Sequence, residues 1–317
     1  SGQSLYSSGY VAYNTSDWQK AMSEWTKLTG RYSSSVSKQV LADAYARLGD
    51  CRFYRHEYTE AEENYGKSIE TYRGTGDYSL FRSGMCRGLR KDYNGKIEVM
   101  ERLCREYPTP EYCAQSLYEE GRAYLQMERS KEAIDVFARL SGSYAGSDYS
   151  RKALAETALI YYQNDEYEKA IPAYKNVIAK YPGSEEAVMA MRDLKSVYVE
   201  MGRVDDYISY TESVSGFAPV EADEKDSLTY ASAEILFTRG NRTAAAESFE
   251  KYLKQYPDGA RRLDANYYLG LIYIDSNQNR KALDCLKTVT ANENSRFYLE
   301  ALTRVAPLAY EMADYRD

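Results

Sequence analysis

Apolar residues recur along almost the whole chain at positions i, i+3, i+4 and i+7, and these stripes come in pairs. Short polar breaks such as QNDEYE, MERSKE and FTRGNR separate the two stripes of a pair, and Pro or Gly often ends the second stripe. The spacing is typical of amphipathic helices, and the breaks are typical of turns and helix ends. The pattern therefore predicts an all-α chain built from helix-turn-helix units.

The helix-turn-helix unit is an internal repeat. A small residue, twelve further positions and a second small residue recur mostly every 37 residues, with a range of 35 to 40. In one copy the small residues are Ala158 and Ala170, and Tyr174 follows. One hairpin cannot bury its apolar stripes alone, so the copies are expected to stack into a solenoid. Eight copies align, at about residues 2–35, 42–75, 77–110, 114–147, 151–184, 188–221, 226–259 and 263–296.

The segments AYARLGD…YTEAEENYGKSIE and YYLGLIY…NRKALDCL place Leu-Gly, then Ala, then an aromatic or apolar residue at fixed offsets. In this the chain resembles the tetratricopeptide repeat (TPR) family over almost its whole length. The resemblance implies an α-solenoid, a right-handed superhelix of about eight helix-turn-helix repeats plus a truncated ninth. Two copies depart from the pattern. The third has Lys96 where Ala is expected, and the sixth has Lys195, Tyr207 and Thr211 at positions that favour small or aromatic residues.

Some copies end in Tyr-Pro, with YPGSEEA and YPDGARRLDA as linkers. These resemble a bacterial cell-envelope subtype of the family, whose members include periplasmic proteins and outer-membrane lipoproteins that act as assembly scaffolds. The resemblance favours a periplasmic or outer-membrane-associated setting, with the cytoplasm as the alternative.

The segment SGFAPVEADEKD at 215–226 is acidic, contains proline and follows the irregular sixth copy. It is the expected hinge between a sub-array at 1–214, with repeats 1–6, and one at 227–317, within a continuous solenoid. The second sub-array holds repeats 7 and 8 and a truncated ninth. The closing letters ADYRD match the start of a second helix, so we expect a fragment of a longer array. Pro172 falls inside a second helix and predicts a bend or a late helix start there.

The charge balance bears on the partner. The formal net charge is -7, the pI is about 5.2 and no basic tract is present. Nucleic acid is therefore a poor candidate partner. The longest uncharged apolar runs fall far short of the ~18 residues that a transmembrane segment needs. Tyrosine is unusually frequent, with 34 residues, and this residue is favoured at recognition surfaces.

Catalytic chemistry has few candidates in this sequence. The single histidine, His56, lies in the polar break of the second repeat and is interpreted as a solvated loop residue. The five cysteines include no Cys-x-x-Cys pair, which argues against a zinc site or a disulfide framework. We expect Cys51 and Cys86 to be buried free thiols, whereas Cys104 and Cys113 flank a turn and are either free or bonded to each other. The sequence predicts no enzyme, no metal site and no cofactor.

In the resembled family, the first helix of each repeat lines a concave groove that holds the ligand. The corresponding positions here carry mainly aromatic residues, namely Tyr6, Tyr10, Tyr13, Tyr54, Tyr78, Phe81, Tyr118, Arg122, Tyr162, Arg192, Tyr230, Phe237 and Tyr267. Such a surface can grip an extended peptide by stacking, with tyrosine hydroxyls bonding its backbone. The alternative is that the tyrosines pack between repeats.

The function predicted from these features is a non-catalytic scaffold for protein–protein interaction. It would bind a protein or an extended peptide in the tyrosine-rich concave groove. The alternative is a structural or self-association module, or a spacer within a longer multi-repeat protein.

Overall fold

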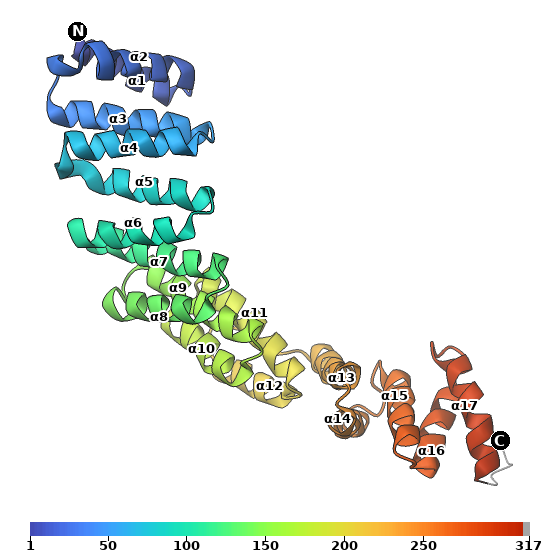
Figure 1. Ribbon diagram of the computed structural model, residues 1–317. Coiled ribbons are helices and arrows are strands. Elements are labelled where there is room, and N and C mark those ends of the chain that lie inside the picture. The colour runs from blue at the N-terminus through green and yellow to red at the C-terminus, as the bar shows by residue number, and fades with distance from the viewer. Residues whose placement is uncertain (313–317) are drawn as a thin grey trace. The chain divides into compact units, whose positions relative to one another are not determined.

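The computed structural model describes residues 1–312, and this part of the chain is built from paired helices (Figure 1). It contains seventeen α-helices, short 3-10 turns at Ser33–Ser35 and Arg73–Thr75, and no strand among the described residues. The prediction of an all-α chain is confirmed. The α-helices are α1 (Gly2–Asn14), α2 (Trp18–Arg31), α3 (Lys38–Tyr54), α4 (Tyr58–Thr71), α5 (Gly76–Leu89), α6 (Tyr93–Glu106), α7 (Pro110–Gln126), α8 (Ser130–Ser143), α9 (Asp148–Gln163), α10 (Tyr167–Lys180), α11 (Glu185–Glu200), α12 (Val204–Ser213), α13 (Ala222–Thr238), α14 (Arg242–Gln255), α15 (Arg262–Asp275), α16 (Asn279–Thr290) and α17 (Tyr298–Glu311).

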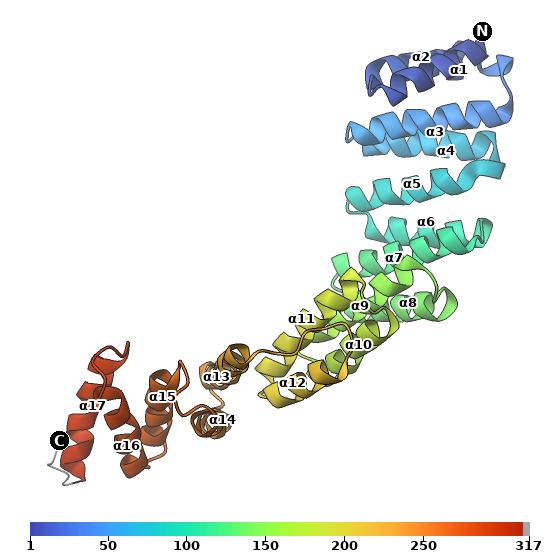
Figure 2. The same cartoon turned by 180° about the vertical axis from the view of Figure 1, so that it is seen from behind.

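Successive helices form hairpins that follow one another in chain order, so the predicted solenoid of helical repeats is confirmed. Helices α1 and α2, α3 and α4, and α15 and α16 are clear examples, and their second helices also pack on the next first helix, as α2 does on α3. Figure 2 shows the hairpins from the opposite side. The eight expected repeats correspond to α1–α16, and α17 is the first helix of the ninth. The expected start of its second helix lies outside the described residues.

Glycines on the first helices let the two helices of a hairpin approach closely. Gly49 on α3 faces the ring of Tyr65 on α4, and a Cβ atom added to this glycine would lie 2.6 Å from a ring carbon. Gly121 on α7 faces Phe137 on α8 in the same way, at 2.3 Å. Both rings are at most 1% exposed. Because any side chain on these glycines would overlap the ring, the close packing of each hairpin depends on them.

The turn inside every hairpin has the same backbone geometry. One residue adopts the left-handed conformation, and the next residue donates its N–H to the carbonyl five positions earlier, as Glu57 does to Arg52 at 3.0 Å. This is a Schellman ending, which satisfies carbonyls at the end of the first helix. Only two of the eight left-handed positions are glycine, although that conformation normally favours glycine. The eight are Ser16, His56, Lys91, Glu128, Asp165, Gly202, Gly240 and Asn277.

Two irregular places in the sequence still form helices. Helix α10 begins at Tyr167, five residues before Pro172, so of the two expectations at this proline the late helix start is wrong and the bend stays a prediction. The proline ring is exposed, and the helix continues to Lys180. In the irregular sixth repeat, Tyr207 and Thr211 are buried in α12, which is 10 residues long.

The chain divides into two compact units, residues 1–157 and the residues from 158 onward, and the boundary lies within α9. The segment expected to be a hinge, 215–226, lies wholly inside the second unit. It includes the non-helical link between α12 and α13, in which Val220 is 7% exposed. The hinge at 215–226 stays a prediction.

The hairpin contact can be tested by adding one methyl group. Gly121→Ala is expected to lower the free energy of unfolding by about 1–3 kcal/mol, because the new Cβ overlaps the Phe137 ring. Gly142→Ala is the matched control in the neighbouring helix α8, where nothing lies within 4 Å of the added Cβ. It should be neutral or stabilising by up to ~1 kcal/mol. Urea denaturation measures both, and equal effects would contradict the close-packing account.

Candidate functional site

The thirteen candidate binding residues all lie on the first helices of their hairpins. They come from α1 (Tyr6, Tyr10, Tyr13), α3 (Tyr54), α5 (Tyr78, Phe81), α7 (Tyr118, Arg122), α9 (Tyr162), α11 (Arg192), α13 (Tyr230, Phe237) and α15 (Tyr267). Each of the two units carries its own set. Their role in binding stays a prediction, so the question is what each side chain presents.

Three of the candidates are well exposed. The Tyr54 side chain is 54% exposed, and its ring stacks on Trp18 with centroids 5.2 Å apart. Arg122 is exposed one turn beyond Tyr118, and its guanidinium carbon lies 6.0 Å from that ring. Arg192 is exposed and pairs with Asp193 at 3.2 Å. These side chains are available to a partner without any rearrangement of the repeats.

The other candidates pack against their neighbours to different degrees. Tyr118, Tyr230 and Tyr267 are buried, at 8%, 5% and 6% exposed. The Tyr267 ring stacks on Phe297 with centroids 4.1 Å apart. Any binding role for these three would rest on the small part of each ring that reaches solvent. The half-buried candidates are Tyr6, Tyr10, Tyr13, Tyr78, Phe81, Tyr162 and Phe237.

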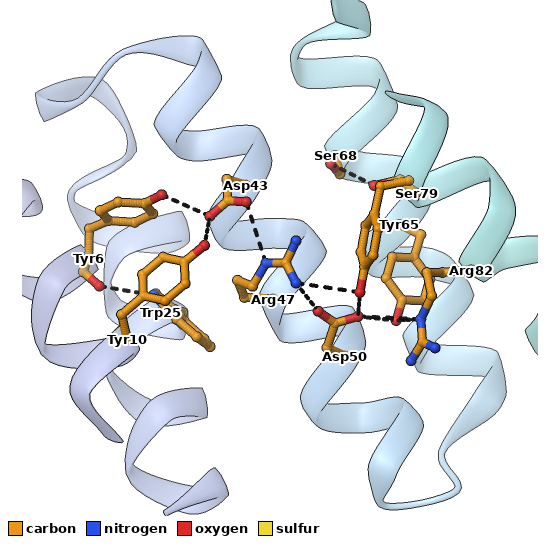
Figure 3. A network of polar contacts seen from close by, with 11 residues as sticks. Tyr6, Tyr10, Trp25, Asp43, Arg47, Asp50, Tyr65, Ser68, Ser79 and Arg82 are labelled. Carbon is orange, nitrogen blue, oxygen red and sulfur yellow. Dashed lines mark hydrogen bonds and ion pairs between the residues drawn. The ribbon is translucent and has the colours of Figure 1, made fainter. Parts of the chain in front are cut away.

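A cluster of polar contacts fixes the tyrosines of the first repeat (Figure 3). Tyr6 and Tyr10 on α1 both donate their hydroxyls to the carboxylate of Asp43 on α3, Tyr6 at 2.8 Å. The two rings meet edge to face, with centroids 5.1 Å apart. Asp43 also accepts from Arg47 Nε at 3.4 Å. One carboxylate therefore holds two half-exposed rings of the preceding repeat in place.

Asp50, two turns beyond Asp43 along α3, is the most heavily bonded carboxylate in the cluster. It is fully buried and accepts hydroxyl donors from Tyr65 and Tyr78, each at 2.7 Å. Arg47 Nη1 donates to it, and Arg82 Nε lies 3.5 Å away. Donors from α3, α4 and α5 thus converge on one buried charge. A charge in the interior is tolerated when it is paired and hydrogen-bonded in this way.

The environment keeps these hydroxyls protonated. Burial, followed by the charge of Asp50, raises the pKa values of Tyr65 and Tyr78 above the ordinary value for tyrosine. Burial alone would lower the pKa of Arg47, but Asp50, Tyr78 and Asp43 raise it overall. At physiological pH the tyrosines are therefore donors, the arginine is a cation and the carboxylates accept.

The tyrosine–carboxylate bond recurs with the period of the repeat. Tyr6 donates to an acceptor 37 residues later. Tyr118 donates to Glu156 at 3.4 Å and Tyr162 to Glu200 at 2.6 Å, each 38 residues later. Burial and these carboxylates raise the pKa values of Tyr118 and Tyr162 to about 12. First helices of successive repeats are therefore linked through tyrosine hydroxyls, whose protons are not free to be donated to a ligand backbone.

The carboxylates that accept these tyrosine hydroxyls were not singled out by the sequence analysis. The stretch LADAYARLGD places Asp43, Arg47 and Asp50 at spacings of four and three among small apolar residues. That spacing puts the three on one side of a helix that the repeat pattern requires to be buried. Charged residues at such positions are the signal that would have revealed the cluster.

Candidates for catalytic chemistry are poorly placed. His56 is exposed in the turn between α3 and α4, where its Nδ1 lies 2.7 Å from the Tyr58 hydroxyl. The five cysteines are free, which settles the open pairing of Cys104 and Cys113 in favour of free thiols. Burial raises the pKa values of Cys51 and Cys86 to about 12. Thiols with such pKa values are poor nucleophiles. Among residues 1–312, no group of His, Cys, Asp and Glu side chains could hold a metal ion.

Glu120 on α7 is a buried carboxyl group that the sequence analysis did not single out. Its side chain is 3% exposed, and its ion pair is a long one, 3.7 Å, to the exposed Arg139. Burial raises the pKa of Glu120 to about 7, which Arg139 opposes and Glu101 supports. The sequence gives no sign of this, because glutamate is usually a surface residue and the packing that buries Glu120 comes from other helices.

Comparison with family models gave three matches on separate segments. A model described as an outer membrane lipoprotein (YfiO) matches residues 110–207. Two models described as tetratricopeptide repeats match residues 78–110 and 230–287. The comparison with curated proteins found no match.

Solved structures similar to this chain include other repeat proteins. A tetratricopeptide repeat protein from Parabacteroides merdae has a TM-score of 0.50 and 15% identity, covering 86% of this chain and 98% of its own. A MamA protein has a TM-score of 0.43 and 22% identity, covering 54% of this chain and 88% of its own. MamA from Desulfovibrio magneticus has a TM-score of 0.42 and 16% identity, covering 54% and 92%. The first of these likenesses supports the fold. In the described part of the chain, no helix combines the length and apolar character needed to span a membrane.

Removing the Asp50 carboxylate should destabilise the protein strongly. Asp50→Ala removes the closer carboxylate partner of the largely buried Arg47 and the acceptor of Tyr65 and Tyr78, so we expect a loss of about 3–5 kcal/mol in the free energy of unfolding. Asp43→Ala is the control, because the Asp43 side chain is 29% exposed and its loss should cost roughly 1–2 kcal/mol. Chemical denaturation measures the free energy of unfolding of both variants. A smaller loss for Asp50→Ala than for Asp43→Ala would contradict the conclusion that Asp50 is the main acceptor of the cluster.

Glu120 should make stability depend on pH. Its pKa is raised in the folded protein to about 7, above the ~4.3 of an unfolded glutamate. The folded state is therefore penalised progressively as pH rises from ~4 to ~7, by up to roughly 3 kcal/mol above that range. Glu120→Gln should match the native protein at pH 4 and exceed it in stability at pH 8.

The control for this pH dependence is Glu101→Gln, which changes an exposed carboxylate beside the same carboxyl group. Thermal unfolding across pH 4–9 is the measurement. A stability difference between Glu120→Gln and the native protein that stays constant with pH would refute the assignment.

Proposed function

The chain belongs to the tetratricopeptide repeat family, and on that premise we propose that it is a non-catalytic scaffold that binds a protein or extended peptide. In each of the two units, the binding surface is the face of its own first helices that carries the candidate tyrosines and arginines. Repeats of this kind stack into extended surfaces suited to holding protein partners.

The observation that carries this proposal is that partly exposed tyrosine rings are fixed by hydroxyl–carboxylate bonds to the next repeat. Tyr6, Tyr10 and Tyr162 are half-buried, and each donates its hydroxyl to such a carboxylate. Because the rings are already ordered, binding costs little additional side-chain entropy. Rigid tyrosine rings of this sort are effective contact surfaces in protein recognition.

The same bonds change how the surface would engage a partner. With their hydroxyls committed, the rings contribute mainly apolar and edge contacts. The exposed arginines supply the charge-assisted bonds, and Tyr54 supplies an exposed ring. We therefore place the polar contacts on Arg122 and Arg192 and not on the tyrosine hydroxyls.

A purely structural role is the second candidate. The bonds from Tyr118 to Glu156 and from Tyr162 to Glu200 link successive repeats, which is what a spacer or self-assembling array requires. The exposed apolar side chains Val188 and Met189 on α11, 57% and 46% exposed, offer a further contact for a second copy.

A bacterial cell-envelope setting is part of the proposal. Its support is the match of residues 110–207 to the outer-membrane-lipoprotein family model, together with the Tyr-Pro linkers in the sequence. Nucleic acid remains a poor partner for a chain with a net charge of -7.

Site-specific crosslinking tests the proposed surface. A photoreactive amino acid is placed at Tyr54, Arg122 or Arg192, and at Tyr32 as the control, and the chain is exposed to envelope proteins of the source organism. Tyr32 is 37% exposed and lies at the end of a second helix. We expect one protein, identified by mass spectrometry, to crosslink at the three first-helix positions and not at Tyr32.

Light scattering on the same variants separates the two candidate functions. A monomer that crosslinks a different protein supports the scaffold. Crosslinks between copies of the chain, with a stable oligomer, would replace it with the self-association module. Equal crosslinking at Tyr32 would show that the first-helix face is not the binding surface.

A further inference from the structure

The third repeat departs from the others at the position where its two helices meet. Six other repeats have a completely buried alanine there, whereas this one has Lys96 on α6. Although it is charged, this lysine is buried, with only 8% of its surface exposed. A buried ammonium group needs a partner and space for its stem. The six alanines are Ala21, Ala61, Ala133, Ala170, Ala245 and Ala282.

Both requirements are met by residues of the neighbouring helices. Gly88 on α5 leaves room for the stem, since a Cβ there would lie 2.8 Å from Lys96 Cδ. The ammonium group donates to Glu119 on α7, and the two side chains are 10% and 15% exposed. Lys96 thus links the third repeat to the first helix of the fourth, and its charge is neutralised.

A pocket of about 260 Å³ lies beside this ion pair. Its size is below the ~300–1,000 Å³ of most small-molecule sites, so it suits a single side chain better than a cofactor. Leu89, which is 49% exposed, contributes to its wall. The lining residues are Met85, Gly88, Leu89, Tyr93, Lys96, Glu119, Arg122, Ala123 and Gln126.

The pocket carries one unneutralised positive charge. Of its charged residues, Lys96 and Glu119 cancel each other, while Arg122 forms no ion pair within the part of the chain that the structure describes. The segment that lines the pocket carries no net negative charge that would oppose an anion. Residues 76–126 contain eight basic and eight acidic side chains, so the net charge of -7 belongs to the rest of the chain.

We propose that this pocket binds an apolar side chain of a partner peptide, and that an Asp or Glu next to it in the peptide pairs with Arg122. The inference rests on the proposed function, because it names the kind of segment that one part of the first-helix face recognises. The ligand class is an acidic–apolar residue pair in an extended peptide.

The chemistry of the lining fits this ligand. The apolar side is formed by Leu89, Ala123 and the flexible Met85, whose thioether adapts to side chains of different shape. Arg122 on the rim presents a planar guanidinium, which binds a carboxylate through two parallel hydrogen bonds. The apolar wall and Arg122 lie next to each other on α5 and α7, the first helices of successive repeats. Adjacent residues of one peptide can therefore reach both.

A peptide array tests the proposal. The probes are immobilised 12-residue peptides of Gly and Ser with a central pair, in which Leu, Met, Phe or Ala is followed by Asp, Glu, Asn or Lys. Labelled full-length chain is applied, and dissociation constants for the best probes are measured by fluorescence anisotropy. We expect Asp and Glu pairs to bind at least tenfold more tightly than their Asn counterparts, and Ala pairs to bind weakly.

Two exposed arginines provide the matched variants. Arg122→Glu should abolish the preference for the acidic residue and weaken binding of the acidic probes at least tenfold. Arg105→Glu changes an exposed arginine on the second helix α6, outside the pocket and outside the proposed binding face, and should leave the binding unchanged. Circular dichroism confirms that both variants are folded.

The outcomes separate this inference from the proposed function. Binding without a preference for acidic pairs, or a preference that survives Arg122→Glu, overturns the inference and leaves the scaffold in place. An array that binds nothing, while crosslinking at Tyr54 still captures a partner, also overturns it. If crosslinking fails as well, the first-helix face is not a binding surface and both proposals are wrong.

Discussion

The close approach of two helices at a glycine is the contact on which the rest of the structure depends. In three hairpins a glycine of the first helix lies directly against a buried aromatic ring sixteen positions later: Gly9 against Trp25, Gly49 against Tyr65, and Gly121 against Phe137. An added Cβ would sit 2.3 to 2.6 Å from those rings. The contact fixes how the two helices of a hairpin align. The same Schellman turn ends the first helix in every copy, and first helices recur mostly every 37 residues.

This regular spacing explains why tyrosine–carboxylate bonds recur between successive repeats. Because successive first helices present equivalent positions 37 or 38 residues apart, a tyrosine in one repeat meets a carboxylate in the next. The tyrosines are therefore neither packing residues alone nor binding residues alone. Their hydroxyls join repeats, while the ring faces of Tyr6, Tyr10 and Tyr162 stay partly open. Stability and a preformed recognition surface come from the same side chains.

Much of the fold was predictable from the sequence, because hairpins, repeat boundaries and close contacts follow from small and apolar residues at local spacings. Other features depend on pairing in three dimensions, which spacing does not reveal. Lys96 was recognised as a departure, yet its partner Glu119 lies in the next repeat. Glu120 resembles a surface residue by type. The charge of Asp50 is visible in the sequence, but its donors Tyr65 and Tyr78 lie on the two following helices. At the hairpin turns, six residues with a left-handed backbone conformation are not glycine, so the sequence does not reveal that conformation.

Footprinting of the tyrosines in a complex tests the central claim most directly, namely that the first-helix face is the surface that holds a partner. Hydroxyl-radical modification is measured for the chain alone and with its crosslinked partner bound. The account predicts protection of Tyr54 and of the half-buried Tyr6, Tyr10 and Tyr162, with Tyr32 and Tyr72 unchanged, because those two follow second helices. Protection of Tyr32 and Tyr72 with unchanged modification of Tyr54 would contradict it.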